Sequence, residues 1–324
     1  SLREALESGA TKIEIDDSVG TIVVTEALEY AGTDAVRILG SGQTIDGAGL
    51  IENLDPIFAV TMGADLFVSN LSFDAGGGYD FDNQGGGKGI FVDIPEDRTG
   101  LVSVRLSNVS VYGTGNHGIH VSDCTLEDDC GSGGGGGGGG STASVELTLV
   151  DVTVDRSGWG KADGDGVRVD ERNDGDIFFS SVNSVFYGNG ADGVELDEGN
   201  DGSIHINVRN NLFDSNGAYC LGDNPEALSD PCNDDGDPDV DDGFDSDEAG
   251  DGSILGLVRN NGVFDNYDEG LDFDEEDDGG FDVLLASNTA TGNEDEGVKL
   301  SEENNVDVVA TLRSHFSEGN NGSS

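Results

Sequence analysis

The stretch ADGVELDEGNDGSIHINVRNNLFDSNG, residues 191–217, is one copy of the unit that decides the fold. It holds three short runs of alternating apolar and polar residues, separated by Gly, Asn and Asp. Copies of this unit align on five glycines whose spacings are 27, 50, 27 and 27 residues: Gly166, Gly193, Gly243, Gly270 and Gly297. The step of 50 is one unit plus an insertion. A unit this short cannot bury a core alone, so the copies are expected to stack into a solenoid.

Apolar and asparagine positions repeat in register with these glycines. In the copy quoted, Val194 and Ile204 follow the glycine by one and eleven residues, and the other copies carry apolar residues there too. An asparagine stands 23 residues after every glycine: Asn189, Asn216, Asn266, Asn293 and Asn320. Three alternating runs per unit predict three parallel strands per turn, hence an all-β, right-handed parallel β-helix with about 27 residues per rung. The asparagines predict an internal hydrogen-bonded ladder.

Acidic residues repeat in the same register. They are Asp165, Asp192, Asp242 and Glu269 just before the glycine; Glu195, Asp245 and Asp272 two residues after it; Asp170, Asp197, Asp247 and Asp274 four after it; Glu171, Glu198, Glu248 and Glu275 five after it; and Asp174, Asp201, Asp251 and Asp278 eight after it. Stacked strands lie about 4.8 Å apart, so each position becomes a column of negative charge. The acids two and four residues after the glycine are expected to point outward as a surface grid, because the apolar residues between them point inward.

These columns predict bound calcium. Two like charges at the rung spacing repel by about 1 kcal/mol in water and by several times more near protein. Calcium accepts six to eight oxygen ligands in irregular geometry, so it suits such a grid better than magnesium does. The insertion adds alternating aspartates, and from Asp237 their spacing resembles an EF-hand loop with Glu248 at its twelfth position. The acids of this loop are Asp235, Asp237, Asp239, Asp241 and Asp242.

The charge balance leaves a second explanation open. With 14 Lys and Arg against 67 Asp and Glu, the net charge is −53, which repels nucleic acid and anionic membranes. A halophilic protein also carries many surface acids and few lysines. Halophilic acids should be scattered, however, whereas these are in register. No apolar run approaches the length of a membrane span.

The chain is expected to form a single domain over residues 1–324. Residues 1–12 predict a capping helix, with Ser1 as N-cap and Gly9 as the stop. Two insertions, 124–142 and 219–241, interrupt the repeat, and each contains a close cysteine pair: Cys124 with Cys130, and Cys220 with Cys232. We expect disulfides that close these loops, and therefore export to an oxidising, extracellular or cell-surface location.

The chain resembles the pectin-lyase-like superfamily of parallel β-helices. The resemblance covers nearly the whole chain, and residues 1–6 (SLREAL) with Ile38–Gly49 (ILGSGQTIDGAG) look like the N-terminal segment of many secreted members. Many members are polysaccharide lyases, epimerases or hydrolases. The segment from Asn116 to Gly118, with His120 and Asp123, is similar to part of the hydrolase Gly-His-Gly motif, and turn histidines are the alternative. The resemblance assigns no catalytic residue.

Two functions follow as hypotheses. The first is a secreted or cell-surface, calcium-binding rod with a structural or adhesive role, whose partners are calcium and either further copies of itself or an anionic polysaccharide bridged by calcium. The alternative is a calcium-dependent polysaccharide lyase or epimerase. Nucleic acid and membrane insertion are not expected.

Overall fold

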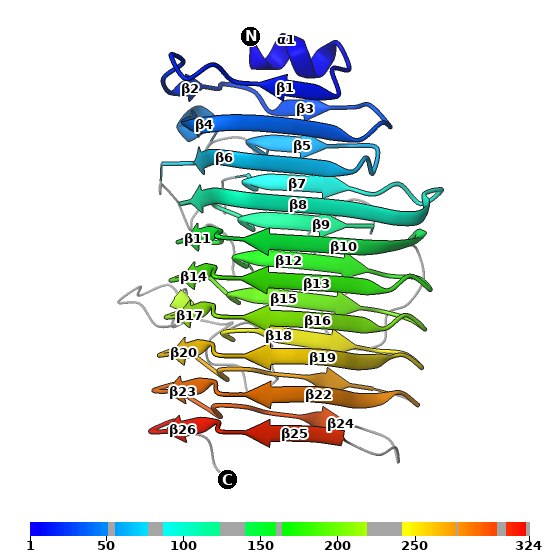
Figure 1. Cartoon of the computed structure of the whole chain (residues 1–324), viewed down its shortest axis with the longest axis vertical. Coiled ribbons are helices and arrows are strands. Elements are labelled where there is room, and N and C mark those ends of the chain that lie inside the picture. Colours follow the sequence, from blue (N-terminus) through cyan, green and yellow to red (C-terminus); the bar gives the residue numbers. More distant parts are fainter. Residues whose placement is uncertain are drawn as a thin grey trace.

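A computed structural model of the chain describes residues 1–50, 56–76, 87–123, 140–159, 164–218, 242–276, 278–302 and 309–321. Rungs of short strands are stacked along one axis, with the N-terminal helix at one end and the C-terminus at the other (Figure 1). All strand pairs are parallel between consecutive rungs. The chain is therefore a parallel β-helix, as the repeat predicts.

The described strands form two sheets along this axis. The 17-stranded sheet contains β1 (Lys12–Glu14), β2 (Ile22–Val23), β4 (Val36–Asp46), β6 (Leu66–Asp74), β8 (Thr99–Tyr112), β10 (Thr142–Val150), β11 (Thr153–Asp155), β13 (Ile177–Val182), β14 (Val185–Tyr187), β16 (Ile204–Arg209), β17 (Leu212–Asp214), β19 (Ser253–Arg259), β20 (Gly262–Phe264), β22 (Gly280–Ala286), β23 (Thr289–Thr291), β25 (Val309–Arg313) and β26 (Phe316–Glu318).

The nine-stranded sheet lies behind it in Figure 1 and runs the length of the stack. It contains β3 (Leu28–Tyr30), β5 (Phe58–Val60), β7 (Ile90–Asp93), β9 (Ile119–Ser122), β12 (Val167–Glu171), β15 (Val194–Glu198), β18 (Asp245–Glu248), β21 (Asp274–Glu275) and β24 (Ser301–Glu302). A 3₁₀ turn, Ala48–Leu50, follows β4.

The N-terminal cap forms as predicted. Helix α1 (Leu2–Glu7) begins with a capping box in which Ser1 and Glu4 satisfy each other's backbone amides. Its Leu6 is buried, and the helix packs against β3. This helix therefore covers the end of the apolar core, which would otherwise face water.

The core confirms the predicted apolar columns. Ile177, Ile204 and Ile254 are paired in register on consecutive rungs, and all three are fully buried. One cluster of buried apolar side chains extends from Leu6 to Ala290. Burial of these columns drives the stacking, because each rung shields the apolar face of the next.

The predicted asparagine ladder is present. Each side-chain amide donates to the side-chain carbonyl of the next copy, at 2.8–3.0 Å from Asn189 through Asn320. The repeat glycines lie beside it because no side chain fits there: a Cβ on Gly193 would lie 2.4 Å from the carbonyl oxygen of Gly243. A second ladder, Asn211, Asn261 and Asn288, was not expected from the sequence.

All four cysteines lie outside the described residues, as do Asp235, Asp237, Asp239 and Asp241. The disulfides, the two insertions and the EF-hand-like loop therefore remain predictions.

Candidate metal centre

The acid columns predicted from the repeat form on the nine-stranded sheet. Strand pairing aligns Asp170 with Asp197, then Asp247, then Asp274. The glutamates one residue further on align in the same way, from Glu171 to Glu302. Since these strands are neighbours, the carboxylates of one column lie one rung spacing apart.

The columns are not at the surface, which corrects the expectation of an outward, solvent-facing grid. The acids two and four residues after the glycine are at most 7% exposed, except for Asp274, which is half-buried. The side chains do point away from the apolar core, as strand alternation requires. Burial of so many carboxylates is unfavourable unless cations or hydrogen bonds compensate for it.

Four groups of three carboxylates bring oxygens within 4.8 Å of one another. They are Asp165, Asp192 and Glu195; Glu195, Asp245 and Asp247; Asp242, Asp245 and Asp272; and Asp268, Glu269 and Asp295. The first three groups are buried, and they share Glu195 and Asp245. Asp268 and Asp295 were not expected from the sequence, because they lie outside the positions that repeat in every copy.

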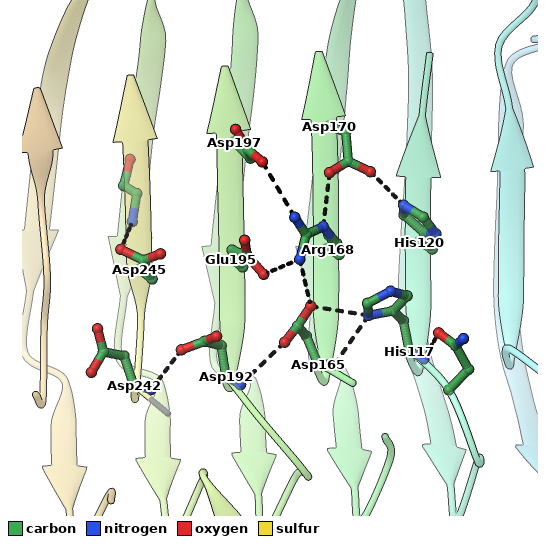
Figure 2. Close-up of polar contacts among 12 residues, drawn as sticks. His117, His120, Asp165, Arg168, Asp170, Asp192, Glu195, Asp197, Asp242 and Asp245 are labelled. Carbon is green, nitrogen blue, oxygen red and sulfur yellow. Dashed lines mark hydrogen bonds and ion pairs between the residues drawn. The ribbon is translucent and has the colours of Figure 1, made fainter. Parts of the chain in front are cut away.

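The acids before the repeat glycine form a ladder of their own. The backbone amide of Asp192 donates to Asp165, that of Asp242 donates to Asp192, and that of Glu269 donates to Asp242, at 2.5–3.2 Å. Each carboxylate is thus fixed by the copy that follows it, and Figure 2 shows Asp165, Asp192 and Asp242 in a row across consecutive rungs.

A buried arginine lies at the N-terminal end of the columns. Arg168, 2% exposed, binds Asp170 at 2.8 Å, Glu195 at 2.5 Å and Asp197 at 3.2 Å, and it lies 3.5 Å from Asp165. Figure 2 shows it at the centre of these carboxylates. Arg172 also binds Asp197. The sequence held the signal, because Arg168 occupies the position of Glu195 and Asp245, but it was not singled out.

Two histidines extend the cluster on β9 and the turn before it. His120 contacts Asp170 at 2.5 Å, and His117 lies 3.0 Å from Asp165, whose backbone amide donates to its Nδ1. Burial lowers the pKa of His120 to about 3, so the ring is neutral. Burial opposes ionisation of Asp165, but His117 and Arg168 outweigh it and lower the pKa of this carboxyl to about 2.

A lysine lies at the C-terminal end. Lys299 Nζ is 2.6 Å from Asp272, 3.4 Å from Glu269 and 3.5 Å from Asp274. These carboxylates raise the pKa of Lys299 despite its partial burial. Between the two ends, burial raises the pKa of Asp197 to about 6 and those of Glu269 and Asp272 to about 7.

The glutamates five residues after the glycine have a different role, because each of them stabilises a turn within its own rung. Glu198 accepts hydrogen bonds from the amides of Asn200 and Gly202, and Glu248 does the same for Gly250 and Gly252. These glutamates therefore hold the turn after the strand. Burial and the neighbouring carboxyl groups raise the pKa of Glu171 to about 11 and that of Glu248 to about 10.

The acids eight residues after the glycine do not join the cluster. Asp174, Asp201, Asp251 and Asp278 are exposed at the turns and belong to none of the close carboxylate groups found in the described residues. Asn200 binds Asp174 at 2.8 Å, which is a turn contact. These four residues remain predicted ligands without a neighbouring carboxylate group among the described positions.

The ligand atoms of the acids before the glycine, and of those two and four residues after it, fit calcium. Every donor in the three buried groups is a carboxylate oxygen, and shared residues join one group to the next. Such a row of hard oxygen ligands suits Ca²⁺, which tolerates irregular geometry and high coordination. Imidazole or thiolate ligands, which other metals favour, contribute to none of these groups among the described residues.

No family model and no curated protein matches the chain. Solved structures that align with it include the enzymatically active domain of bacteriophage CBA120 tailspike protein 2, at 12% identity and a TM-score of 0.47, covering 98% of this chain and 39% of that one. Geobacillus virus E2 ORF18 aligns at 14% identity and a TM-score of 0.40, covering 98% of this chain and 56% of that one.

The A-module of Azotobacter vinelandii mannuronan C-5 epimerase AlgE6 aligns at 13% identity and a TM-score of 0.26, over 98% of this chain and 94% of that one. The chain spans about two fifths and just over half of the two viral chains. The parallel β-helix itself rests on the chain's own strand pairing. Within the described residues, no helix has the length and apolarity needed to cross a bilayer.

Proposed function

We propose that this chain is a calcium-loaded β-helical rod with a structural or adhesive role outside the cell or on its surface. The observation that carries the proposal is the repetition of buried three-carboxylate groups on consecutive rungs. Calcium would be held by Asp165, Asp192 and Glu195, by Asp245 and Asp247, and by Asp242 and Asp272. The ions would neutralise charge that the fold has already removed from water.

The resident cations support this arrangement. Arg168 contacts Glu195 of the first group and Lys299 contacts Asp272 of the third, so each cation compensates part of the charge at its end of the columns, and calcium would compensate the rest. Arg168 and Lys299 both stand two residues after the repeat glycine. The copies between them carry Glu195, Asp245 and Asp272 at this position, and there a bound ion would supply the positive charge. The repeat thus uses the same position for a cation in its first and last copies and for a ligand in the copies between them.

Calcium titration of the purified protein tests the proposal. We expect saturable, multi-site binding by isothermal titration calorimetry in molar NaCl, and binding weaker by at least about tenfold in Asp245→Asn, since Asp245 belongs to two groups. Asp282→Asn, at an exposed acid of β22 that is not a predicted ligand, is the matched control and should bind as the parent does. A linear, non-saturating heat in high salt would instead favour halophilic acidity, and equal effects of the two variants would reject the buried site.

The structural role makes a separate claim about assembly. Bound calcium could join acidic surfaces of two copies, or join the rod to an anionic polysaccharide. We expect the size of assemblies, measured by light scattering over a range of concentrations, to fall on chelation. A monomer whose mass is unchanged by chelator and by concentration would argue against self-association.

A second candidate function is a calcium-dependent polysaccharide lyase or epimerase. The observation that favours it is the pair of His–Asp contacts on either side of Arg168, an arrangement able to move protons near a bound carboxylate. All these groups are buried, and a polymer cannot reach buried side chains, so the structural role is preferred. Incubation with polyuronates, followed by the absorbance of unsaturated chain ends or by sugar epimer analysis, separates the two.

A further inference from the structure

The outward face of the long strands in the 17-stranded sheet carries little of the chain's acidity. Six of these strands, β10, β13, β16, β19, β22 and β25, are paired one to the next and face the viewer in Figure 1. Their outward side chains alternate with core-facing ones, and on these six strands only two outward residues are acidic, Glu146 and Asp282. We call this surface the long-strand face.

Apolar side chains occupy the centre of the long-strand face. Leu255 and Leu257 of β19 point outward, and Leu284 of β22 is paired in register with Leu257. Phe178, which is 36% exposed, stacks its ring on His205 of the next strand, with the ring centres 4.7 Å apart. A patch of this kind gains free energy when a partner removes it from water.

Arginines line the border of this face at which the strands end. Arg209 and Arg259 are paired in register on β16 and β19, and Arg313 ends β25 two rungs further on. All three are exposed. Within the part of the chain that the structure describes, none of their side chains has an ion-pair partner, although the chain holds 67 acids and only 14 bases. This arginine border therefore offers positive charge that the chain itself does not neutralise.

Aspartates line the opposite border, in the turns at which the strands begin. They are the exposed residues Asp174, Asp201, Asp251 and Asp278, which precede β13, β16, β19 and β22. On two neighbouring rungs the chain runs from an aspartate at one border to an arginine at the other, from Asp201 to Arg209 and from Asp251 to Arg259. The long-strand face thus has a negative border, an apolar centre and a positive border.

A face with this order of charges is complementary to a second copy of itself. A two-fold axis parallel to the rod places the two faces together with their strands running in opposite directions, so each arginine border meets the aspartate border of the other copy. A two-fold axis along the strands would instead bring like borders together. We infer that two copies of this chain pair through their long-strand faces, with the rods parallel and the apolar centres in contact.

The spacing and the area of the face also fit a second copy. Both rods repeat every rung, about 4.8 Å, so Arg209 and Arg259 of one copy can meet Asp201 and Asp251 of the other at matching heights. Six rungs span about 29 Å, and the eight residues between the borders span about 26 Å, which gives about 750 Å². Each partner of a stable complex buries about 800 Å². An unrelated acidic protein would not repeat its charges at this interval.

The inference goes beyond the proposed calcium function. The buried carboxylate groups belong to the nine-stranded sheet, which lies behind the long-strand face in Figure 1, and this contact needs no ion. Each copy carries a net charge of −53, so the two molecules repel one another at long range. We therefore expect a dimer of micromolar affinity that forms best in salt, because salt screens the long-range repulsion more than the close contacts.

Sedimentation equilibrium of the full chain tests the pairing, in about 0.5 M NaCl with chelator and again with calcium. With chelator present, we expect the mass to rise from that of one chain to that of two between about 1 and about 100 µM. Larger assemblies that calcium holds together should fall to this dimer on chelation, and not to the single chain.

Charge reversal locates the borders. Arg259→Glu and Asp251→Arg should each weaken the dimer by about tenfold or more, because each places like charges opposite one another. The double variant has opposite charges across the contact again, and it should regain most of the affinity of the parent.

An aromatic pair of variants locates the centre. Phe178→Asp should weaken the dimer by about tenfold or more, because it places a charge in the apolar contact. Tyr187→Asp is the matched control, since this 43% exposed aromatic lies on the short strand β14, and it should change the affinity by less than about twofold. Circular dichroism of each variant should match the parent, since both side chains lie at the surface.

Several outcomes would overturn the inference while leaving the calcium proposal intact. These are saturable calcium binding by a chain that keeps the mass of one copy at every concentration, a dimer that dissociates on chelation, a double variant as weak as its single variants, or equal losses in Phe178→Asp and Tyr187→Asp. A single chain that binds polyglutamate through the arginine border would show that the partner is another acidic polypeptide. A dimer that persists in a chain without calcium binding would support the inference and reject the calcium proposal.

Discussion

The N-terminal and C-terminal rungs of the nine-stranded sheet differ most on the outward face of the sheet. Facing the core, Val60, Val92, Val121 and Val169 are paired in register and fully buried, and the column continues with Leu196 and the buried Ser246. Facing outward, the neighbouring column changes along the stack from Ala59 and Phe91 through His120 and Arg168 to Glu195 and Asp245. The inner column is thus buried in both regions, whereas the outer column becomes acidic toward the C-terminal rungs, where we propose that calcium binds.

Chelation should separate these two regions most strongly. Two sites held at 100 times their Kd contribute about 2.7 kcal/mol each, so calcium removal should lower the free energy of unfolding by about 5 kcal/mol or more. Denaturant titration with and without chelator measures the total. Hydrogen exchange should then show faster amide exchange in β12, β15 and β18, with β3, β5 and β7 of the same sheet still protected. Equal changes in both regions would contradict the comparison.

The Arg168→Met variant tests the end of the columns that carries its own cation. Its removal takes the shared cation away from Glu195 and from Asp165, Asp170 and Asp197, which keep only His117, His120 and Arg172 as partners. We therefore expect a loss of about 3–5 kcal/mol in the free energy of unfolding. Arg209→Met, at an exposed position of β16, is the control and should cost less than about 0.5 kcal/mol. Similar values for the two arginines would show that Arg168 is not essential to the cluster.

The fall of stability with rising pH should be steeper without calcium than with it. The raised pKa values of Glu171 and Glu248 mean that the calcium-free folded chain retains protons that the unfolded chain has released between about pH 5 and 10. Stability of the calcium-free protein should therefore fall as pH rises, by about 1.4 kcal/mol per pH unit for each retained proton. Calcium should weaken this dependence, because ion binding requires the charged form of proposed ligands such as Asp272, whose pKa burial raises to about 7. Urea titrations at pH 6 and pH 8 measure both slopes.

The asparagine ladder is confined to the C-terminal copies and should contribute less than Arg168. Asn216→Ala leaves the amide groups of Asn189 without their acceptor, and we expect a loss of about 2 kcal/mol. Asn207→Ala is the control, since this half-buried side chain makes a single long bond to Ser180. Thermal unfolding followed by circular dichroism compares the two variants. A larger loss for Asn207→Ala would reject the ladder as a stabilising element.

Lys299→Gln should have the smallest effect. Its side chain is 37% exposed, so solvent screens the contacts with Asp272 and Glu269, and we expect a loss of about 1 kcal/mol. Lys12→Gln, which removes an exposed pair with Glu14, should change the stability by less than about 0.5 kcal/mol. Denaturant titration measures the loss for each variant. A loss for Lys299→Gln as large as that for Arg168→Met would contradict the expectation, drawn from the burial of Arg168, that the two ends of the columns contribute unequally.

Much of the site was predictable from the repeat because stacking converts sequence period into spatial column. The alignment of Asp170 with Asp197 and Asp247 follows from the 27-residue unit alone, and so does the ladder from Asn189 onward. Arg168 and Lys299 were missed because they break the acidic pattern.

The order of residues along the chain was enough to specify the rungs, their register and the identity of each column, because a fixed period leaves one way to stack apolar faces. Burial of the acids was decided only in three dimensions. Whether a side chain that points away from the core meets water or other side chains depends on what the folded chain places against it, and neighbouring carboxylates, arginines and histidines from different rungs come together only after stacking. That environment, and not the acidic composition, determines whether these groups need a cation.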